Sequence, residues 1–306
     1  MFTQFFHVAF NVVLPIFLVM ALGYVLAKKF TLDLNTLSKL NFYVFIPVYM
    51  FYSLLWFKPN PQDMEWSVLF NILFVGLSFL LMFIIAKAFR FNKSMVPMSL
   101  LTAVIFNSAN YGIPVVEQAF HDEGIPIQII TITVMNVLTY TMGVLITGGW
   151  GEWREGFKTI LKLPILYALF GALLLRVLSI PLPDALMSSL KWTSDGMLSI
   201  ALLTLGAQLS QGGLSMKHPK ELWLTVAGRL ILGPLLALLI LKGFAITGLT
   251  AKVLFVSSAF PTAVITVMFG IEYKRTPLFA ADVVFLTTLL SAFSVTIAIS
   301  LANYLF

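Results

Sequence analysis

Two polar segments that contain glycine or proline interrupt otherwise apolar stretches of the sequence. Residues 107–114 read NSANYGIP and residues 257–262 read SSAFPT. Proline removes a backbone donor and clashes with the preceding helical turn, glycine costs about 1 kcal/mol relative to alanine in a helix, and asparagine prefers helix caps. Each segment therefore predicts a helix break, which leaves free N–H groups and about +0.5 of partial charge where the next half-helix begins.

The chemistry that these breaks favour is the binding of a small carboxylate. Two half-helix N-termini that approach from opposite sides attract an anion, and asparagine, serine and threonine side chains add directed donors. We expect this centre to need no buried Lys or Arg. The alternative is that Pro114 and Pro261 only kink ordinary helices. The candidate substrate-binding residues are Asn107, Asn110, Tyr111, Gly112, Pro114, Ser258, Ala259, Phe260, Pro261, Thr262 and, on a neighbouring stretch, Asn136.

Three ionisable residues inside apolar stretches are further candidates, because charges within a membrane span are usually functional. Asp195 and Arg229 both fall near the middle of a span and could pair with each other. Asp195 could equally pair with Lys191 at i−4, and Arg229 could extend to the membrane interface. Glu117 lies in the first turn after the first break, where a carboxylate complements the helix dipole. Ion coupling through Asp195 or Glu117 is the alternative role.

The composition predicts that the solvent around these residues is a lipid bilayer. Of 306 residues, 59% are hydrophobic and 10% are charged, and the mean hydropathy is +0.97, whereas soluble domains are about a quarter charged. A soluble enzyme, a disordered chain and a nucleic-acid binder are therefore excluded. The chain has no cysteine, its histidines are isolated, and no glycine-rich phosphate loop precedes Lys93. We expect no enzyme activity, no bound metal and no cofactor.

The elements that must position the candidate residues are transmembrane helices, which need about 20 apolar residues each. The sequence contains ten such stretches, which predict an all-α polytopic membrane protein with ten spans. Their expected limits are Phe5–Ala27, Leu37–Trp56, Trp66–Ala88, Val96–Phe120, Pro126–Thr147, Thr159–Leu178, Asp184–Gln208, Glu221–Leu241, Leu249–Phe269 and Pro277–Asn303.

Basic residues indicate the orientation of these spans. Most Lys and Arg fall on alternate connections, which the positive-inside rule places in the cytoplasm. Both termini are then expected outside, and the net charge of +6 reflects topology. We expect a multi-pass protein of a cell membrane, such as a bacterial inner membrane.

An internal repeat relates the two halves of the chain. Leu14-Pro15-Ile16 recurs as Leu163-Pro164-Ile165, and Ser108-Ala109 recurs as Ser258-Ala259, at offsets of 149 and 150 residues. The sequence predicts a first five-helix repeat at 1–147, a glycine-rich linker at 148–158, and a second repeat at 159–306. Because five is odd, the second repeat enters the membrane from the opposite side, as in secondary transporters whose substrate site lies between inverted repeats.

The motifs resemble those of the auxin efflux carrier family, which includes PIN-type auxin carriers and bacterial malate or malonate permeases. The residues concerned are Asn107-x-x-Asn110-x-Gly112-x-Pro114, the run 205–209 (LGAQL), 259–263 (AFPTA) and 287–291 (TTLLS). The resemblance implies a fold like that of bile-acid sodium symporters and NhaA. Spans 1, 2, 6 and 7 form a scaffold that is often dimeric, and spans 3–5 and 8–10 form a moving, elevator-type transport domain. Broken spans 4 and 9 cross in that domain and bind the substrate carboxylate.

The expected function is secondary transport or facilitated diffusion of a small organic anion by alternating access. The short linker departs from the long hydrophilic loop of plant PIN carriers, so a dicarboxylate is favoured over auxin. The expected partners are this anion, the lipid bilayer and a second copy of the chain. Three questions stay open: which anion is moved, in which direction, and whether H⁺ or Na⁺ moves with it. The alternatives are a cation–proton exchanger that uses Asp195 and Glu117, and a membrane sensor that does not transport.

Overall fold

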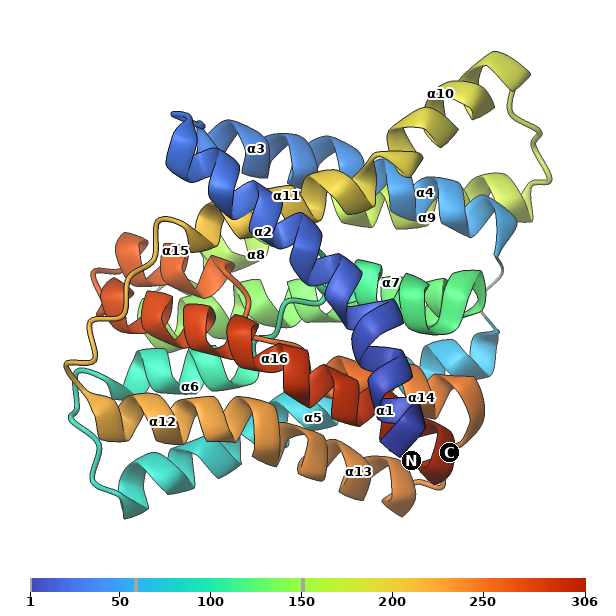
Figure 1. Cartoon of the computed structure of the whole chain (residues 1–306). Helices are drawn as coiled ribbons and strands as arrows, with labels where there is room; N and C mark the ends of the chain where they lie inside the picture. Colours follow the sequence, from blue (N-terminus) through green and yellow to red (C-terminus); the bar gives the residue numbers. More distant parts are fainter. Residues whose placement is uncertain (1, 58–59, 150–151) are drawn as a thin grey trace.

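The computed structural model describes residues 2–57, 60–149 and 152–306, and the regular structure of these ranges is helical apart from one isolated β-bridge (Figure 1). The first half contains α1 (Phe2–Val8), α2 (Leu14–Lys29), α3 (Leu34–Leu40), α4 (Ile46–Trp56), α5 (Pro61–Ala88), α6 (Val96–Val104) and α7 (Gly112–Thr147). The second half contains α8 (Trp153–Leu161), α9 (Pro164–Val177), α10 (Asp184–Asp195), α11 (Met197–Leu209), α12 (Pro219–Ala227), α13 (Gly233–Gly243), α14 (Gly248–Ser258), α15 (Ile265–Glu272) and α16 (Pro277–Leu305).

Long apolar helices confirm that the chain is a polytopic membrane protein. In the described ranges, five helices are long and apolar enough to cross a bilayer, namely Thr3–Lys29, Pro61–Ala88, Gly112–Thr147, Pro219–Gly243 and Pro277–Leu305. Large apolar side chains also cover their outer faces. Leu239 and Leu278 are 70% and 66% exposed, an arrangement that lipid stabilises and water does not.

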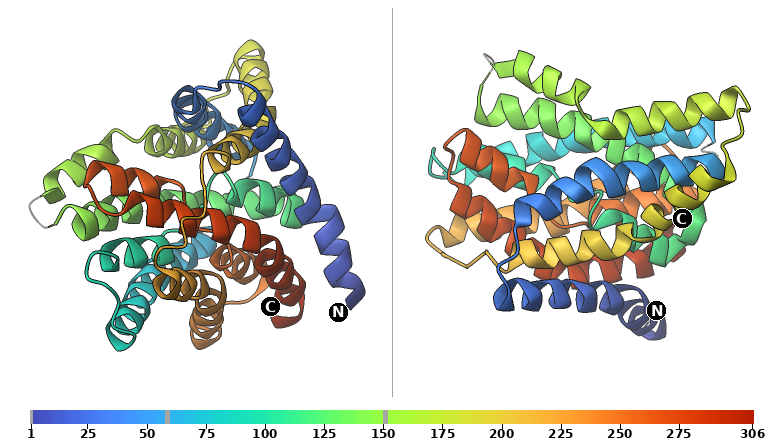
Figure 2. Two further views of the ribbon diagram at one scale, coloured as in Figure 1. Left: turned by 60° about the vertical axis from the view of Figure 1, so that its left-hand side comes forward. Right: turned by 90° about the horizontal axis from the view of Figure 1, so that it is seen from above.

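The helices pack as two groups (Figures 1 and 2). In one group, α2 lies against α11, and α4 lies against α9 and α10; in the other, α5, α6, α7 and α12–α16 pack on one another. The end of α16 lies beside α1, so both chain ends are on the same side of the molecule. The second group contains both interrupted segments.

Glycines allow the closest helix crossing, between α2 and α11. A Cβ atom on Gly206 would overlap the carbonyl oxygen of Met20, and one on Gly23 would overlap that of Leu203. Small residues permit such close approach of two helices in membranes.

Several helix boundaries differ from the expected ones. The span expected at 184–208 is two helices that join at Gly196. By contrast, α7 consists of two helical segments that meet at a kink at His121 (φ 53°), inside the connection expected at 121–125. Helix α8 begins inside the expected linker, of which Trp150 and Gly151 lie outside the described residues.

Within the described ranges, three π-helical turns interrupt the longer helices. They are η1 (Ala9–Val13) between α1 and α2, η2 (Asn41–Phe45) between α3 and α4, and η4 (Gly228–Leu232) between α12 and α13. Such turns are frequent at functional sites. Here η2 and η4 each present a polar side chain toward the interrupted segments.

Candidate functional site: where two helix breaks meet

Both helix breaks are present. The first separates the end of α6 at Val104 from the start of α7 at Gly112, and the second separates the end of α14 at Ser258 from the start of α15 at Ile265. The two helix ends are thus 154 residues apart and the two starts 153. Because Ser258 ends a helix whereas Ser108 lies inside a break, the two Ser-Ala pairs do not occupy equivalent positions.

The two breaks contact each other through their backbones. Phe106 and Thr262 form an antiparallel bridge, and the N–H of Asn107 donates a 2.8 Å hydrogen bond to the carbonyl of Pro261. Segments more than 150 residues apart in the sequence therefore form one junction.

The second break presents its polar groups inward. Ser258, Ala259 and Thr262 are fully buried. The Ser258 hydroxyl donates to the Phe255 carbonyl at 2.5 Å, and the Thr262 hydroxyl donates to the Thr102 carbonyl at 2.7 Å. In this conformation each hydroxyl proton already has an acceptor within the protein.

Aromatic rings fill the interior of the junction. Phe74, Phe106, Phe260 and Tyr111 form consecutive edge-to-face contacts with centroids 5.7–6.2 Å apart, and all four residues are at most 2% exposed. Tyr111 and Phe260 were expected to face the substrate. They instead pack between the breaks, because edge-to-face rings stabilise a core beyond the area that they bury.

The accessible part of the junction is smaller than the expected site. Asn110 is half-buried, and its Oδ1 accepts a 3.0 Å hydrogen bond from Nδ2 of Asn41, the first residue of η2. Among the described residues, the N–H groups of residues 109–111 have no acceptor, and neither do those of Val264 and Ile265. The N–H of Gly112 is paired, because it donates to the carbonyl of Asn107 at 3.1 Å.

Gln128 is a residue of the junction that the sequence did not reveal. Its side chain is fully buried in α7. Nε2 donates to the Ser108 carbonyl at 2.6 Å, and Oε1 accepts from the Ser257 hydroxyl at 2.9 Å. The amide therefore joins the two breaks. A glutamine among isoleucines in a long apolar stretch was the available signal, since a buried amide requires partners.

One face of α16 completes the junction. Thr287, Ser291 and Ser294 follow the i, i+4, i+7 spacing of one helix face. The Thr287 hydroxyl accepts from the N–H of Thr262 at 3.1 Å, and the Ser294 hydroxyl donates to the Ala259 carbonyl at 3.0 Å. Ser291 donates to the Tyr111 hydroxyl at 2.9 Å.

Arg229 lies against both breaks and is fully buried. Its guanidinium donates to the carbonyls of Ala103 and Val104 at 3.1 and 3.2 Å, and to the carbonyl of Ser258. Three expectations are therefore wrong: the residue does not extend to the membrane interface, does not pair with Asp195, and places a buried cation at a centre expected to have none. The reason is that helix packing brings the ends of α6 and α14 within reach of the long Arg229 side chain, so their carbonyls become its partners.

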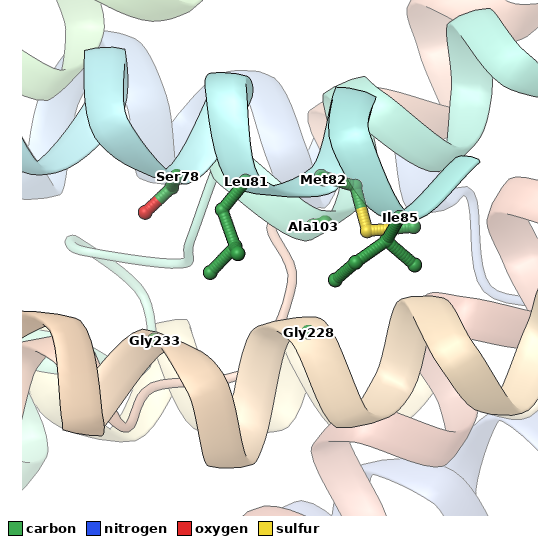
Figure 3. A pocket seen from close by; sticks show the side chains of 7 residues that line it. All are labelled: Ser78, Leu81, Met82, Ile85, Ala103, Gly228 and Gly233. Carbon is green, nitrogen blue, oxygen red and sulfur yellow. The ribbon is translucent and has the colours of Figure 1, made fainter. Parts of the chain in front are cut away.

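A small cavity lies next to the turn that carries Arg229 (Figure 3). Ser78 and Met82 of α5 line one wall, and Gly228 and Gly233 line the other. Ala103 also lines the cavity. Its volume is about 10 Å³, close to the minimum for one water molecule. The Ser78 hydroxyl has no protein partner among the described residues, so a water molecule here would satisfy it.

The remaining candidates bond residues outside the two breaks. Asp195 forms a 2.7 Å ion pair with Lys191, and both side chains are more than half exposed. Glu117 lies five residues after the start of α7, so the expectation that it falls in the first turn is wrong. Its carboxylate accepts a 2.5 Å hydrogen bond from the Tyr49 hydroxyl. The Asn136 side chain donates to the carbonyl of Ile132, one turn earlier in its own helix.

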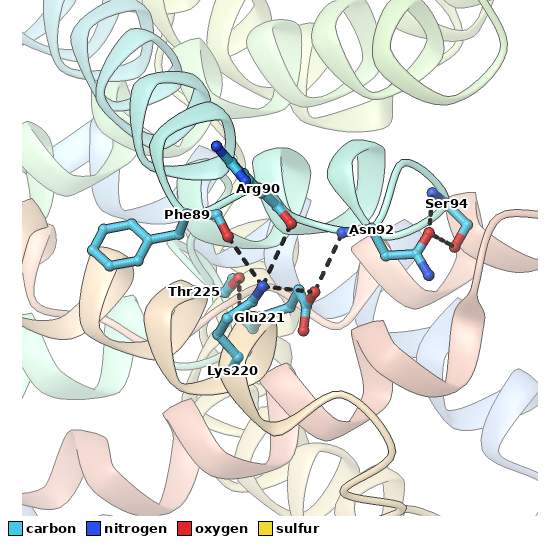
Figure 4. Close-up of polar contacts among 7 residues, drawn as sticks. All are labelled: Phe89, Arg90, Asn92, Ser94, Lys220, Glu221 and Thr225. Carbon is cyan, nitrogen blue, oxygen red and sulfur yellow. Dashed lines mark hydrogen bonds and ion pairs between the residues drawn. The ribbon is translucent and has the colours of Figure 1, made fainter.

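A polar cluster ties the α5–α6 connection to the start of α12 (Figure 4). The Lys220 ammonium donates to the Phe89 carbonyl at 3.0 Å, and the buried Glu221 carboxylate accepts from the N–H of Asn92 at 3.3 Å. Both sides of this contact belong to the helix group that holds the breaks, so the cluster strengthens that group.

The whole chain matches a known family. Residues 8–159 and 156–299 match the family described as membrane transport protein. The chain belongs to this family. It is the family of the auxin efflux carriers. Within it, an uncharacterized transporter of Methanocaldococcus jannaschii is similar to this chain, with 25% identity over 300 residues that cover 92% of this chain and 94% of the relative. Membership of the family makes the chain a membrane transport protein.

Proposed function

We propose that the chain is a secondary transporter or facilitator of a small organic anion and that the anion binds where the two breaks meet. A dicarboxylate such as malate or malonate is the preferred substrate class, and an auxin-like carboxylate is the alternative. The observation that carries the proposal is the set of backbone N–H groups at 109–111 and 264–265 that have no acceptor in the described part of the chain. Residues 109–111 directly precede α7, and residues 264–265 lie at the start of α15. At the N-terminus of a helix the dipole favours negative charge.

The electrostatics of the junction support an anionic ligand. The two helices that enter the breaks, α6 and α14, end with carbonyls that pair with the Arg229 guanidinium. The positive charge of Arg229 therefore compensates the negative C-terminal ends of α6 and α14. In the part of the chain that the structure describes, the first turns of α7 and α15 contain no acidic residue. Their positive ends therefore attract an anion to the accessible side, at Asn110 and Val264.

The proposed architecture has ten spans in two inverted repeats, residues 1–147 and 159–306, joined by the linker at 148–158. In this arrangement α6 with the start of α7 forms broken span 4, and α14 with α15 forms broken span 9. The packing of the helices in two groups, the position of both chain ends on one side and the paired breaks support it. Both termini are placed outside a cell membrane.

Alternating access then requires the group of α5–α7 and α12–α16 to move against the group of α2–α4 and α9–α11. Two side-chain hydrogen bonds join the groups at the first break, Asn41 with Asn110 and Tyr49 with Glu117. Asn41 and Tyr49 are eight residues apart along η2 and α4, which is about two helical turns. A shift of one group by one turn would therefore break both bonds. We place the homodimer interface on the group of α2–α4 and α9–α11, which stays still.

Uptake of labelled malate or malonate into proteoliposomes tests the function. We expect uptake by the native chain and at least tenfold slower uptake by Asn110→Ala and by Pro261→Ala. Thr141→Ala, whose hydroxyl donates to Val137 in its own helix, is the control. Normal uptake by both site variants would refute the site. Flux of Na⁺ or H⁺ without any organic anion would support the cation–proton exchanger instead, and anion binding without flux would support a sensor.

A further inference from the structure

The buried guanidinium of Arg229 lies in a cage of backbone carbonyls. Ala103 and Val104 are the last two residues of α6, and Ser258 is the last residue of α14. All three of their carbonyls accept hydrogen bonds from Arg229. Carbonyls at helix C-termini are unpaired within the helix and carry its negative partial charge, so the cage attracts a cation.

The charge of the cage matches that of the guanidinium. In the described ranges Arg229 has no ion pair with a carboxylate. Two helix C-termini carry about −0.5 each, hence about −1 together, against the +1 of arginine. The rings of Phe74 and Phe106 add to the cage, since each centroid lies 5.3 Å from Cζ of Arg229, within the range of cation–π attraction.

The backbone around Arg229 is adapted to hold this cation. The residue occurs in the π-helical turn η4, which displaces it relative to a regular helix. One turn later, a Cβ atom on Gly233 would come within 2.9 Å of Nη2 of Arg229 and within 3.4 Å of the Ser258 carbonyl oxygen. Glycine therefore leaves room for the guanidinium at this position.

We propose that Arg229 is a tethered cation, which occupies a site for a monovalent cation between the C-terminal ends of α6 and α14 and thereby holds the two breaks together. Carbonyl oxygens are the ligands that bind free monovalent cations in proteins. Removal of the side chain would leave the cage empty and able to accept a free guanidinium ion. The proposal concerns the fold of the junction, so it does not depend on which substrate the chain carries.

Thermal unfolding of the purified full chain in detergent tests the proposal. We expect Arg229→Ala to lower the Tm by roughly 10 °C, since a buried charge network loses one partner. Millimolar methylguanidinium chloride should restore part of this loss, whereas choline chloride at the same ionic strength should not. The native chain should respond to neither salt, because its cage is filled.

Arg176→Ala is the matched control. Arg176 also donates to two consecutive carbonyls at a helix C-terminus, those of Leu54 and Leu55 in α4, but it is only half-buried. Water can replace it there, so we expect a smaller loss of Tm and no recovery with methylguanidinium. A native Tm in Arg229→Ala, or equal recovery with choline, would overturn the proposal.

A second set of variants covers the case in which Arg229→Ala does not fold. Arg229→Lys keeps the charge with a smaller head group and should lower the Tm less. Gly233→Ala should then destabilise the native chain more than the Arg229→Lys chain, because its Cβ presses on the guanidinium and not on an ammonium. Purely additive effects of the two substitutions would contradict a cage built around the guanidinium.

Discussion

Gly112 and Gln128 lie so close together that a Cβ atom on Gly112 would come within 2.6 Å of Nε2 of Gln128 and within 2.8 Å of the Phe260 ring. The same Nε2 donates to the carbonyl of Ser108 in the first break. The start of α7 is therefore packed directly against the amide that joins both breaks, and the absence of a side chain at 112 is a steric requirement.

Gly112→Ala should destabilise the junction. The added methyl group must displace the Gln128 amide or the Phe260 ring, and overpacking of this kind costs about 1–3 kcal/mol. We expect a lower Tm in detergent and slower anion uptake. Gly76→Ala in α5 is the control, because a Cβ there meets nothing within 4 Å and alanine favours a helix. An unchanged Tm in Gly112→Ala would contradict the packing described here.

Substitution of Gln128 should separate the structural from the electrostatic role of the junction. Gln128→Ala leaves the Ser108 carbonyl and the Ser257 hydroxyl without their partner, at a cost of about 2 kcal/mol. Gln128→Glu keeps an acceptor for Ser257 but adds negative charge beside the proposed anion site. We expect the glutamate variant to raise the KM for the anion more than the alanine variant does. Equal KM values in uptake assays would count against an anion site here.

Cross-linking between the two helix groups should stop transport. The chain has no cysteine, so Tyr49→Cys with Glu117→Cys gives a protein with only two thiols, at side chains that are hydrogen-bonded at 2.5 Å between the two groups. A short thiol-specific cross-linker should block uptake, and a reducible linker should allow recovery. The control pair is Asp63→Cys with Thr250→Cys, which are hydrogen-bonded at 2.5 Å between α5 and α14 of the same group. Uptake that survives the first cross-link would exclude the proposed movement.

Gly206→Ala should disturb the crossing of α2 and α11. The new Cβ would overlap the backbone of Met20, and backbone cannot move aside as a flexible side chain can, so we expect a loss of about 3 kcal/mol. In Gly171→Ala, by contrast, the Cβ would lie 3.5 Å from the Phe51 ring, an ordinary contact. Unfolding in detergent should show a lower Tm for the first variant only.

Asp33 gives one pH-dependent contribution to stability. It caps α3, and hydrogen bonds from the Thr36 hydroxyl and the Asn35 N–H to its carboxylate hold the pKa of Asp33 below its usual value. A pKa that is lower in the folded chain stabilises it above the unfolded pKa of about 4, and this contribution is lost as the pH falls through the folded pKa.

The Tm difference between the native chain and Asp33→Ala should therefore shrink in acid. Asp33→Asn, which can cap the helix without titrating, should show a difference from the native chain only at neutral pH. A difference between native and Asp33→Ala chains that stays constant down to about pH 3 would contradict the cap as described.

The sequence alone determined the features that depend on neighbouring residues. The apolar composition indicates the bilayer, and proline, glycine and asparagine disfavour helix within a few residues, so the breaks near Pro114 and Pro261 were predictable. The pairing of Asp195 with Lys191 follows from i, i+4 spacing in a helix and was one of the two pairings considered.

Only the tertiary structure decided which side of each break is buried and what Arg229 and Gln128 contact. Arg229 bonds carbonyls that are 126 and 125 residues away in the sequence, and Gln128 bonds a hydroxyl 129 residues away. No local pattern encodes such partners, because they depend on how separate helices pack. Ser258 and Thr262 are polar residues in a break, so they were expected to face a ligand. The Ser258 hydroxyl donates within its own helix, to Phe255, and only the packing against α6 gives the Thr262 hydroxyl its acceptor, the Thr102 carbonyl.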